Sequence, residues 1–319
     1  MASSDDHSPS KTANAFNNTS HEFQDAAVEK PSLEKAELPA HIPGDGKEGI
    51  KNRLEDFPDG GWRAWLNVFG AVCTCFSTFG FINSWGVFQA YYQETILKDY
   101  SPSAVAWIGS IQYALIFLPG LVVGRLFDIG YFRAVFLTCN ALLLLATFLT
   151  AQCTRYWHFL LCQGIVVGVA SGGLYGCSNA IMAHWFRRLR GRAVGYMSIG
   201  TALGGTVFPI VAKKLIPQVG FPWTVRIIGF MLILTTGLSI LTLKRRLPPV
   251  NIKGGLFNWA VFRDAHYTVY TLSTFMFFMG LYTVLTYVSV SAVQLGVAPD
   301  LAFYFVAISN GGSLFGEIY

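Results

Sequence analysis

The chain has 319 residues, of which 53% are hydrophobic, 15% are aromatic and only 13% are charged. This composition is too apolar for a single soluble core, so it excludes an ordinary soluble domain. The charges are also uneven, because residues 1–58 hold eleven acids and six bases, whereas residues 59–319 hold seven acids and seventeen bases. The basic excess lies in short loops between apolar runs, which is typical of membrane edges and argues against a nucleic-acid partner.

Residues 1–58 are rich in Ser, Asp, Glu, Lys and Pro and show no periodic apolar face. Such a segment buries too little apolar surface to offset the entropy lost on ordering, and we predict a disordered cytoplasmic tail. It contains no apolar stretch that could act as a cleavable signal. The folded part is therefore expected to begin at residue 59.

Eight charge-poor runs follow, several of them longer than the bilayer core. They are Ala64–Gln93, Ser101–Gly124, Ala134–Thr154, Tyr156–Phe186, Ala193–Ala212, Pro222–Leu243, Ala265–Ala298 and Leu301–Gly316. Lys213, Lys214, Pro217 and Pro222 are expected to separate the fifth run from the sixth. The sequence predicts an all-α multi-pass membrane protein, with a six-helix bundle at residues 59–244, a cytoplasmic connecting loop at 245–264 and a partial second bundle of two helices at 265–319.

Lys and Arg residues are concentrated at one set of helix ends. Fourteen lie on that side: Lys51, Arg53, Arg63, Arg125, Arg133, Arg187, Arg188, Arg190, Arg192, Lys244, Arg245, Arg246, Lys253 and Arg263. Only four lie on the other side, and they are Lys98, Arg155, Lys213 and Lys214. This positive-inside bias predicts a cytoplasmic amino terminus in a protein whose surroundings are the lipid bilayer.

A short charged island lies between the second and third runs. Asp128 stands between Arg125 and Arg133, and Gly124 and Gly130 would allow close backbone approach in a tight turn. The spacing Gly-x-Leu-x-Asp-x-Gly, with a basic residue after it, resembles the signature loop between helices two and three of the major facilitator superfamily of transporters. We predict that Asp128 pairs with an arginine and acts as a conformational latch.

Two further stretches resemble motifs of the monocarboxylate-porter family, fungal type. Asp59–Trp62 is similar to the motif that precedes helix one, and Trp185–Gly195 followed by Gly200 is similar to the motif between helices four and five. The basic residues of this second motif are Arg187, Arg188, Arg190 and Arg192. They also serve as topology anchors, and the two interpretations are compatible. The resemblance covers the chain from about Asp59 to Tyr319.

Polar side chains within the runs are the candidates for a solute site, because lipid cannot satisfy their hydrogen bonds. They are Asn83, Gln89, Gln112, Tyr113, Gln163, Tyr175, Asn179, Tyr282, Tyr287 and Asn310. Each of them could instead bridge two helices. Small residues at helical spacing, in sets that contain Gly124, Gly172 and Gly204, favour close helix packing.

At three positions this sequence departs from the pattern that the monocarboxylate-porter family uses for carboxylate transport. A Lys in helix one is associated with proton and carboxylate handling in the monocarboxylate-porter family, and that position falls at Asn83 here. The family's Arg in helix eight falls at Glu317, and the acid one turn earlier falls at Ser313. These departures favour a facilitator for a neutral or weakly polar solute.

We therefore expect a secondary transporter of small organic solutes that works by alternating access. The alternative is a truncated, non-transporting or regulatory membrane protein of the same fold, because the predicted second half stops after two helices. An enzyme is not expected, since the sequence has no His-x-x-x-His pair, no paired intramembrane carboxylates and no Gly-x-Ser-x-Gly motif. Nor do the six cysteines have the spacing of a zinc or redox site, so neither a metal nor a cofactor is expected.

Overall fold

The computed structural model describes residues 59–249, 259–297, 308–309 and 312, and all regular elements within these ranges are helices. The predicted tail, the middle of the predicted connecting loop and most of the eighth run lie outside the described residues. Six of the described helices are long and apolar enough to cross a membrane. These six correspond to the first six predicted runs.

The first span is built from α3 (Trp62–Cys75), η2 (Phe76–Gly80), α4 (Trp85–Tyr91) and η3 (Tyr92–Ile96). The second contains α5 (Pro102–Phe117) and α6 (Gly120–Ile129), and the third is α7 (Phe132–Thr150). The fourth contains α8 (Tyr156–Phe159), η4 (Leu160–Val166) and α9 (Val167–Trp185). The fifth is α10 (Arg190–Val219) and the sixth is α11 (Phe221–Thr242), after which come η5 (Trp259–Arg263) and α12 (Ala265–Gln294).

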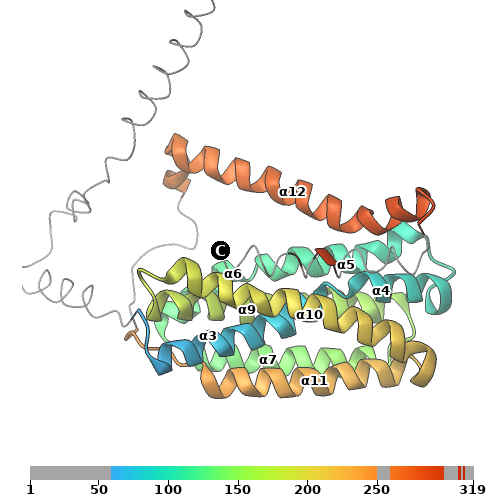
Figure 1. Cartoon of the computed structure of the whole chain (residues 1–319), viewed down its shortest axis with the longest axis horizontal. Coiled ribbons are helices and arrows are strands. Elements are labelled where there is room, and N and C mark those ends of the chain that lie inside the picture. The colour runs from blue at the N-terminus through green and yellow to red at the C-terminus, as the bar shows by residue number, and fades with distance from the viewer. Residues whose placement is uncertain (1–58, 250–258, 298–307, 310–311, 313–319) are drawn as a thin grey trace, which may run out of the picture. The chain divides into compact units, whose positions relative to one another are not determined.

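The six spans form one bundle in which the helices run alongside one another (Figure 1). The first span lies at its centre, because α3 packs against α9, α10 and α11. The fourth span is the second central element, since α9 also packs against α5, α6 and α7. The first and fourth spans therefore share neighbours on several sides, and residues on both can contribute to one site.

Glycines allow two pairs of spans to approach at backbone distance. A Cβ atom added at Gly204 of α10 would lie 2.7 Å from the Cα atom of Gly80 in the first span. A Cβ atom added at Gly172 of α9 would lie 2.6 Å from the carbonyl oxygen of Ile116 in α5. These contacts confirm the predicted glycine seams on the fourth and fifth spans, whereas a Cβ at Gly124 would meet nothing within 4 Å.

The connection between the fifth and sixth spans differs from the prediction. α10 continues through Lys213, Lys214 and Pro217 to Val219, and Gly220 alone joins it to α11. Pro217 is tolerated because α10 packs along α11, and neighbouring helices can compensate for a lost backbone hydrogen bond. The predicted break at Lys213 was therefore wrong, and the chain turns at Gly220, whose φ of +80° suits glycine.

The loop between the second and third spans is also shorter than predicted. α6 includes Gly124, Arg125 and Asp128 and ends at Ile129, so these residues are helical rather than part of a turn. Gly130 terminates the helix in a left-handed conformation with φ +116°, and its N–H donates to the carbonyl of Phe127. The predicted tight turn is confirmed at Gly130 and was wrong for Gly124, which lies within α6.

Candidate functional site

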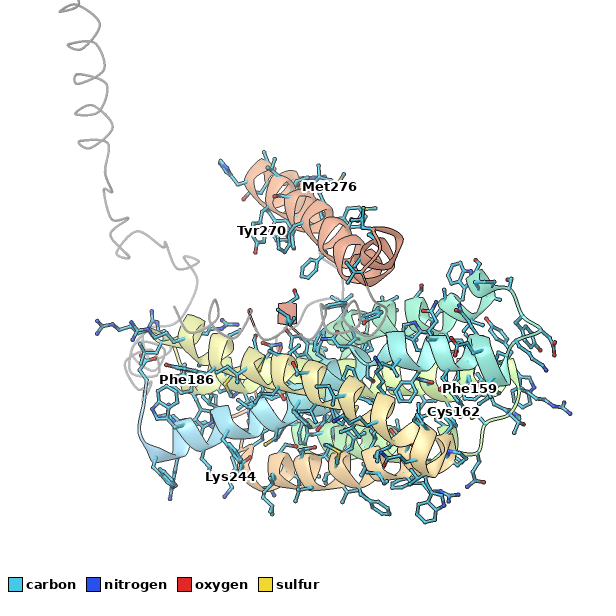
Figure 2. The ribbon with its side chains drawn as sticks, turned by 45° about the vertical axis from the view of Figure 1, so that its right-hand side comes forward. Phe159, Cys162, Phe186, Lys244, Tyr270 and Met276 are labelled. Atoms are coloured by element: carbon cyan, nitrogen blue, oxygen red, sulfur yellow. The ribbon has the colours of Figure 1, made fainter. Side chains whose placement is uncertain are left out.

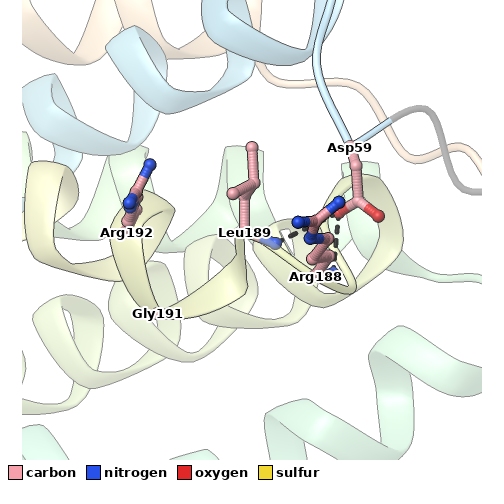
Figure 3. A pocket seen from close by; sticks show the side chains of 5 residues that line it. All are labelled: Asp59, Arg188, Leu189, Gly191 and Arg192. Atoms are coloured by element: carbon pink, nitrogen blue, oxygen red, sulfur yellow. Dashed lines mark hydrogen bonds between the residues drawn. The ribbon is translucent and has the colours of Figure 1, made fainter.

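One end of the bundle carries most of the described arginines. At this end, Asp59 hydrogen-bonds to the connection between the fourth and fifth spans. The Oδ1 atom of Asp59 accepts hydrogen bonds from the backbone N–H groups of Arg187 at 2.7 Å, Arg188 at 2.9 Å and Leu189 at 3.3 Å. Figure 3 shows the carboxylate directed at this loop, beside a pocket of about 500 Å³ that Arg188 and Arg192 also line. The start of the first span is thereby tied to the connection between the fourth and fifth spans.

The environment of Asp59 favours its charged form. Desolvation by itself would raise the pKa of this carboxyl group, but the hydrogen bonds from Arg187, Leu189 and Arg188 outweigh that effect. The pKa of Asp59 consequently lies below its ordinary value. Asp59 also has a left-handed backbone with φ +40°, a conformation that Asp tolerates better than most residues and that turns its side chain toward the loop.

The predicted basic cluster between the fourth and fifth spans is divided by the helix boundary. Arg187 and Arg188 lie in the connection and give backbone donors to Asp59, while Arg190 and Arg192 lie in the first turn of α10. The side chains of all four are exposed at this end of the bundle. The sequence analysis predicted the basic cluster but did not predict Asp59 as its partner. The available signal was that this acid is followed directly by two glycines.

A second fastening involves Arg245, which sequence reasoning had counted only as a topology residue. Its guanidinium donates to the backbone carbonyls of Phe127 and Asp128, the latter at 3.1 Å. Its Cζ atom lies 5.1 Å from the centroid of the Phe127 ring, and Pro249 packs over Gly130 with its Cγ atom 3.1 Å from where a Cβ would lie. Arg245 therefore caps the carboxyl-terminal end of α6, where free carbonyls and the helix dipole both favour a cation.

The segment after the sixth span is held to two other helices. The indole N–H of Trp185 donates to the carbonyl of Lys244 at 2.8 Å, and the N–H of Lys244 donates to Oδ1 of Asn67 at 2.7 Å. Figure 2 shows Lys244 and Phe186 at the same end of the bundle, with Phe159 and Cys162 toward the other. The ends of the first, second, fourth and sixth spans are thus connected at one edge.

The predicted latch residues lie at this edge, near the end of α6 and the start of α7. Asp128 and Arg133 are exposed, whereas Arg125 is half-buried on α6. The backbone carbonyl of Asp128 accepts a hydrogen bond from the guanidinium of Arg245. An ion pair between the Asp128 carboxylate and an arginine therefore stays a prediction.

Two of the predicted solute residues are fully enclosed. Gln163 accepts a hydrogen bond from the hydroxyl of Tyr92 at 2.6 Å, and both side chains are buried between the first and fourth spans. Gln112 is also buried, and its Oε1 atom has no hydrogen-bond partner within the described part of the chain. Gln163 is therefore placed as a bridge between helices rather than as a residue that a solute can reach.

Four other candidates are half-buried. Asn83 is on the first span, Tyr113 on the second, and Tyr175 and Asn179 on the fourth. The hydroxyl of Tyr113 donates to the carbonyl of Ile82 at 3.4 Å, which places it next to Asn83. The structure thus brings together candidates from the first and second spans.

Phe79 joins this group, although sequence reasoning did not select it. Its ring centroid lies 4.7 Å from that of Tyr175 at 77° and 5.7 Å from that of Phe117 at 57°. In the sequence, nothing distinguishes a site residue among the aromatic residues of an apolar run. Phe79 is identified as a candidate only by its contacts with residues of two other spans.

The remaining candidates are not brought into this group by any described contact. Gln89 is half-buried on α4, farther along the first span. Tyr282 and Tyr287 belong to α12, and nothing is described of their side chains, while Asn310 lies outside the described residues. In the described ranges, no group of His, Cys, Asp and Glu side chains has the arrangement of a metal site.

Comparison with known proteins agrees with this architecture. Residues 71–318 match the family model described as Major Facilitator Superfamily. The chain is 38% identical over 265 residues to "MFS-type transporter 1" of Ophiocordyceps sp. (strain BCC 1869), covering 82% of this chain and 58% of that protein. It is 36% identical over 265 residues to "Aspyridones efflux protein apdF" of Emericella nidulans, covering 83% of this chain and 54% of that one.

The fold is similar to a solved transporter structure as well. The peptide transporter POT in complex with alafosfalin matches with a TM-score of 0.50 and 18% identity, over 80% of this chain and 53% of that chain. The present chain therefore spans between half and two thirds of the lengths of these proteins. The family match covers most of the chain and the bundle has the expected six spans, so the chain belongs to the Major Facilitator Superfamily.

Proposed function

We propose that this chain is part of, or acts as, a secondary transporter that moves an uncharged small organic solute by alternating access. The observation that carries the proposal is the distribution of charge along the described spans. Every Asp, Glu, Lys and Arg in them lies within about two turns of a helix end. The middle of the bundle instead presents amides, phenols and aromatic rings.

This distribution disfavours an anionic solute. A carboxylate at the bilayer midplane needs a cation or several converging donors, because leaving it unpaired costs several kcal/mol even after relaxation. Asn83 occupies the position where the monocarboxylate-porter resemblance implies a Lys, and it can donate a hydrogen bond but supplies no charge. A neutral or aromatic solute is therefore a better match than a lactate-like or pyruvate-like anion.

The proposal includes the resemblance to monocarboxylate porters at the level of architecture. We assign residues 59–244 to the first six-helix half, residues 245–264 to the connection and residues 265–319 to the beginning of the second half. The solute would bind between the halves, using Asn83, Gln89 and the tyrosines of the fourth and seventh helices. Transporters of this kind move one half against the other around a central site.

The direction of transport that we propose is export. One relative is named an efflux protein for aspyridones, and 36% identity over 265 residues makes a similar role a reasonable expectation. The relative's name supports export of an organic product, whereas the identity of the present solute is a separate question.

Uptake of labelled pyruvate by vesicles, measured at two external pH values, tests the charge argument. We expect no saturable pyruvate uptake above that of empty vesicles, at either pH. The Glu317→Gln variant is the control, because it removes the acid at the position where the family resemblance implies Arg. Saturable uptake that rises with acid pH and survives Glu317→Gln would show that an anion site exists and would overturn the proposal.

A further inference from the structure

We infer that Phe79, Phe117 and Tyr175 form an aromatic platform that binds a flat, uncharged aromatic ring of the transported solute, with the Asn179 amide as its polar contact. This inference rests on the proposed transport function and adds the chemical class of the solute. The platform combines rings from three different spans, which meet although they are far apart in the sequence.

The three rings contact one another edge-on or in tilted arrangements, and Phe117 also meets Phe278 of α12 at 6.0 Å. Phe79 meets Tyr175 edge-on at 4.7 Å and meets Phe117 in a tilted arrangement at 5.7 Å. In an edge-on contact, the rim of one ring points at one face of the other ring. The opposite face of that second ring is not covered by this contact. A planar solute can add to such a group by stacking or by a further edge-on contact.

Exposure separates this platform from the sealed aromatic core of the bundle. Phe117 is 45% exposed, and Phe79 and Tyr175 are half-buried. By contrast, the ring of Tyr92 is fully buried and contacts the rings of Phe159, Phe88 and Phe221. The group around Tyr92 is therefore a packing core, whereas the platform has accessible surface.

The platform lies at the depth where a transport site is needed. Each of its residues is in the middle third of its span, as judged from the bounds Trp62–Ile96, Pro102–Ile129 and Tyr156–Trp185. Charged groups are confined to the helix ends, so a charged ring substituent here would lack a partner. The site consequently selects an uncharged ring.

On each side of the platform, an amide side chain lies one helical turn away. Asn83 is four residues after Phe79 and Asn179 is four residues after Tyr175, so each shares a helix face with its ring. The first and fourth spans are antiparallel, and each amide is offset from the rings by about 6 Å in opposite senses. Two or three fused rings carrying polar groups at their ends would match this spacing.

The amides retain hydrogen-bonding capacity. The Asn179 amide donates a long bond of 3.4 Å to the carbonyl of Tyr175 and also hydrogen-bonds to the Tyr175 side chain, and its Oδ1 atom can serve as an acceptor. In the described part of the chain, no hydrogen bond is recorded for the Asn83 side chain. Lipid cannot supply the missing partners at this depth, whereas a solute with an N–H and a carbonyl group can.

Equilibrium binding of labelled carbostyril to the chain in lipid vesicles tests the platform. Carbostyril is neutral and flat, and it has two fused rings and a ring amide. We expect saturable binding that its saturated bicyclic analogue and the anion naphthoate do not displace. Phe79→Leu should weaken binding about fivefold through loss of the aromatic contact. Asn179→Leu should weaken it by a similar factor through loss of the hydrogen bond.

Phe69→Leu is the matched control, because Phe69 is on the same helix and is 48% exposed. It should bind carbostyril as the unmodified chain does. Phe117→Leu repeats the test at a residue with an exposed side chain, in case Phe79→Leu fails to fold. No carbostyril binding by the unmodified chain, or equal affinity in Phe79→Leu, Phe117→Leu and Phe69→Leu, would overturn the platform.

A failure of the proposed transport function can be distinguished from a failure of the aromatic platform. A chain that binds carbostyril with the expected variant effects, yet supports no saturable flux of it across vesicles, would have the platform without transport. A chain that transports neutral solutes with Phe79→Leu and Phe117→Leu both unaffected would transport without the platform.

Discussion

The Oδ1 atom of Asp59 lies 2.7 Å from the backbone nitrogen of Arg187, a contact between residues 128 positions apart. Because the same oxygen also accepts from Arg188 and Leu189, one carboxylate organises the connection between the fourth and fifth spans. The fold depends at this point on a single charged acceptor.

Replacing Asp59 by Asn should destabilise the bundle at neutral pH, because a charged acceptor of three N–H groups becomes a neutral one. The folded-state pKa of Asp59 is lowered, so its contribution is present above the unfolded-state pKa and is lost as pH falls through the folded-state value. The difference in thermal midpoint between the two proteins should therefore disappear on the acid side of about pH 4. Asp99→Asn, at an exposed acid between the first two spans, is the control. An equal loss in both variants at neutral pH would contradict the assigned role.

Replacing Arg245 by Gln should loosen the end of α6. The guanidinium donates to two carbonyls of that helix and covers the Phe127 ring, so its loss should cost about 1–2 kcal/mol of unfolding free energy. Hydrogen exchange of the amides in α6 measures the local effect. Arg190→Gln, at an exposed position, should leave that exchange unchanged. Unchanged protection of α6 in Arg245→Gln would show that the cap is not required.

Gly204→Ala should separate the first and fifth spans. The added Cβ would lie 2.7 Å from the Cα of Gly80, a contact that only backbone movement can relieve, at a cost of about 1–3 kcal/mol. Gly237→Ala in α11 is the matched control, since a Cβ there meets nothing within 4 Å. Thermal unfolding in detergent compares them, and equal midpoints would argue against a tight seam.

Asp128→Asn should change exchange between conformations more than it changes folding. Asp128 is exposed at a membrane edge, so a pair with an arginine would contribute only about 1 kcal/mol. Transport rate per molecule of membrane-inserted protein measures the effect. The latch idea fails if the variant is merely less abundant and the surviving protein behaves normally.

The amino terminus should be cytoplasmic, because fourteen Lys and Arg residues mark that side against four on the other. A single cysteine introduced at Ser10 should be protected from an impermeant thiol reagent in intact cells and labelled after permeabilisation. Labelling from outside intact cells, or glycosylation at Asn17, would reverse the topology.

The sequence alone determined the six described spans and the concentration of charge at their ends. Both are local properties, since a run of apolar residues must cross lipid as a helix whatever its neighbours are. The sequence-based prediction of a helix break at Lys213 was wrong, because the packing of α10 against α11 outweighs the helix-breaking tendency of Pro217.

Tertiary structure alone decided which side chains meet. Gln163 and Asn179 look alike in sequence, yet Tyr92 satisfies and encloses Gln163 while Asn179 stays half-buried beside the platform. Likewise, nothing local to Asp59, Arg245 or Phe79 identifies a partner, since each contacts residues that are far away in the sequence. These contacts arise because glycine seams and helix lengths fix how the spans align, and alignment is a property of the whole bundle.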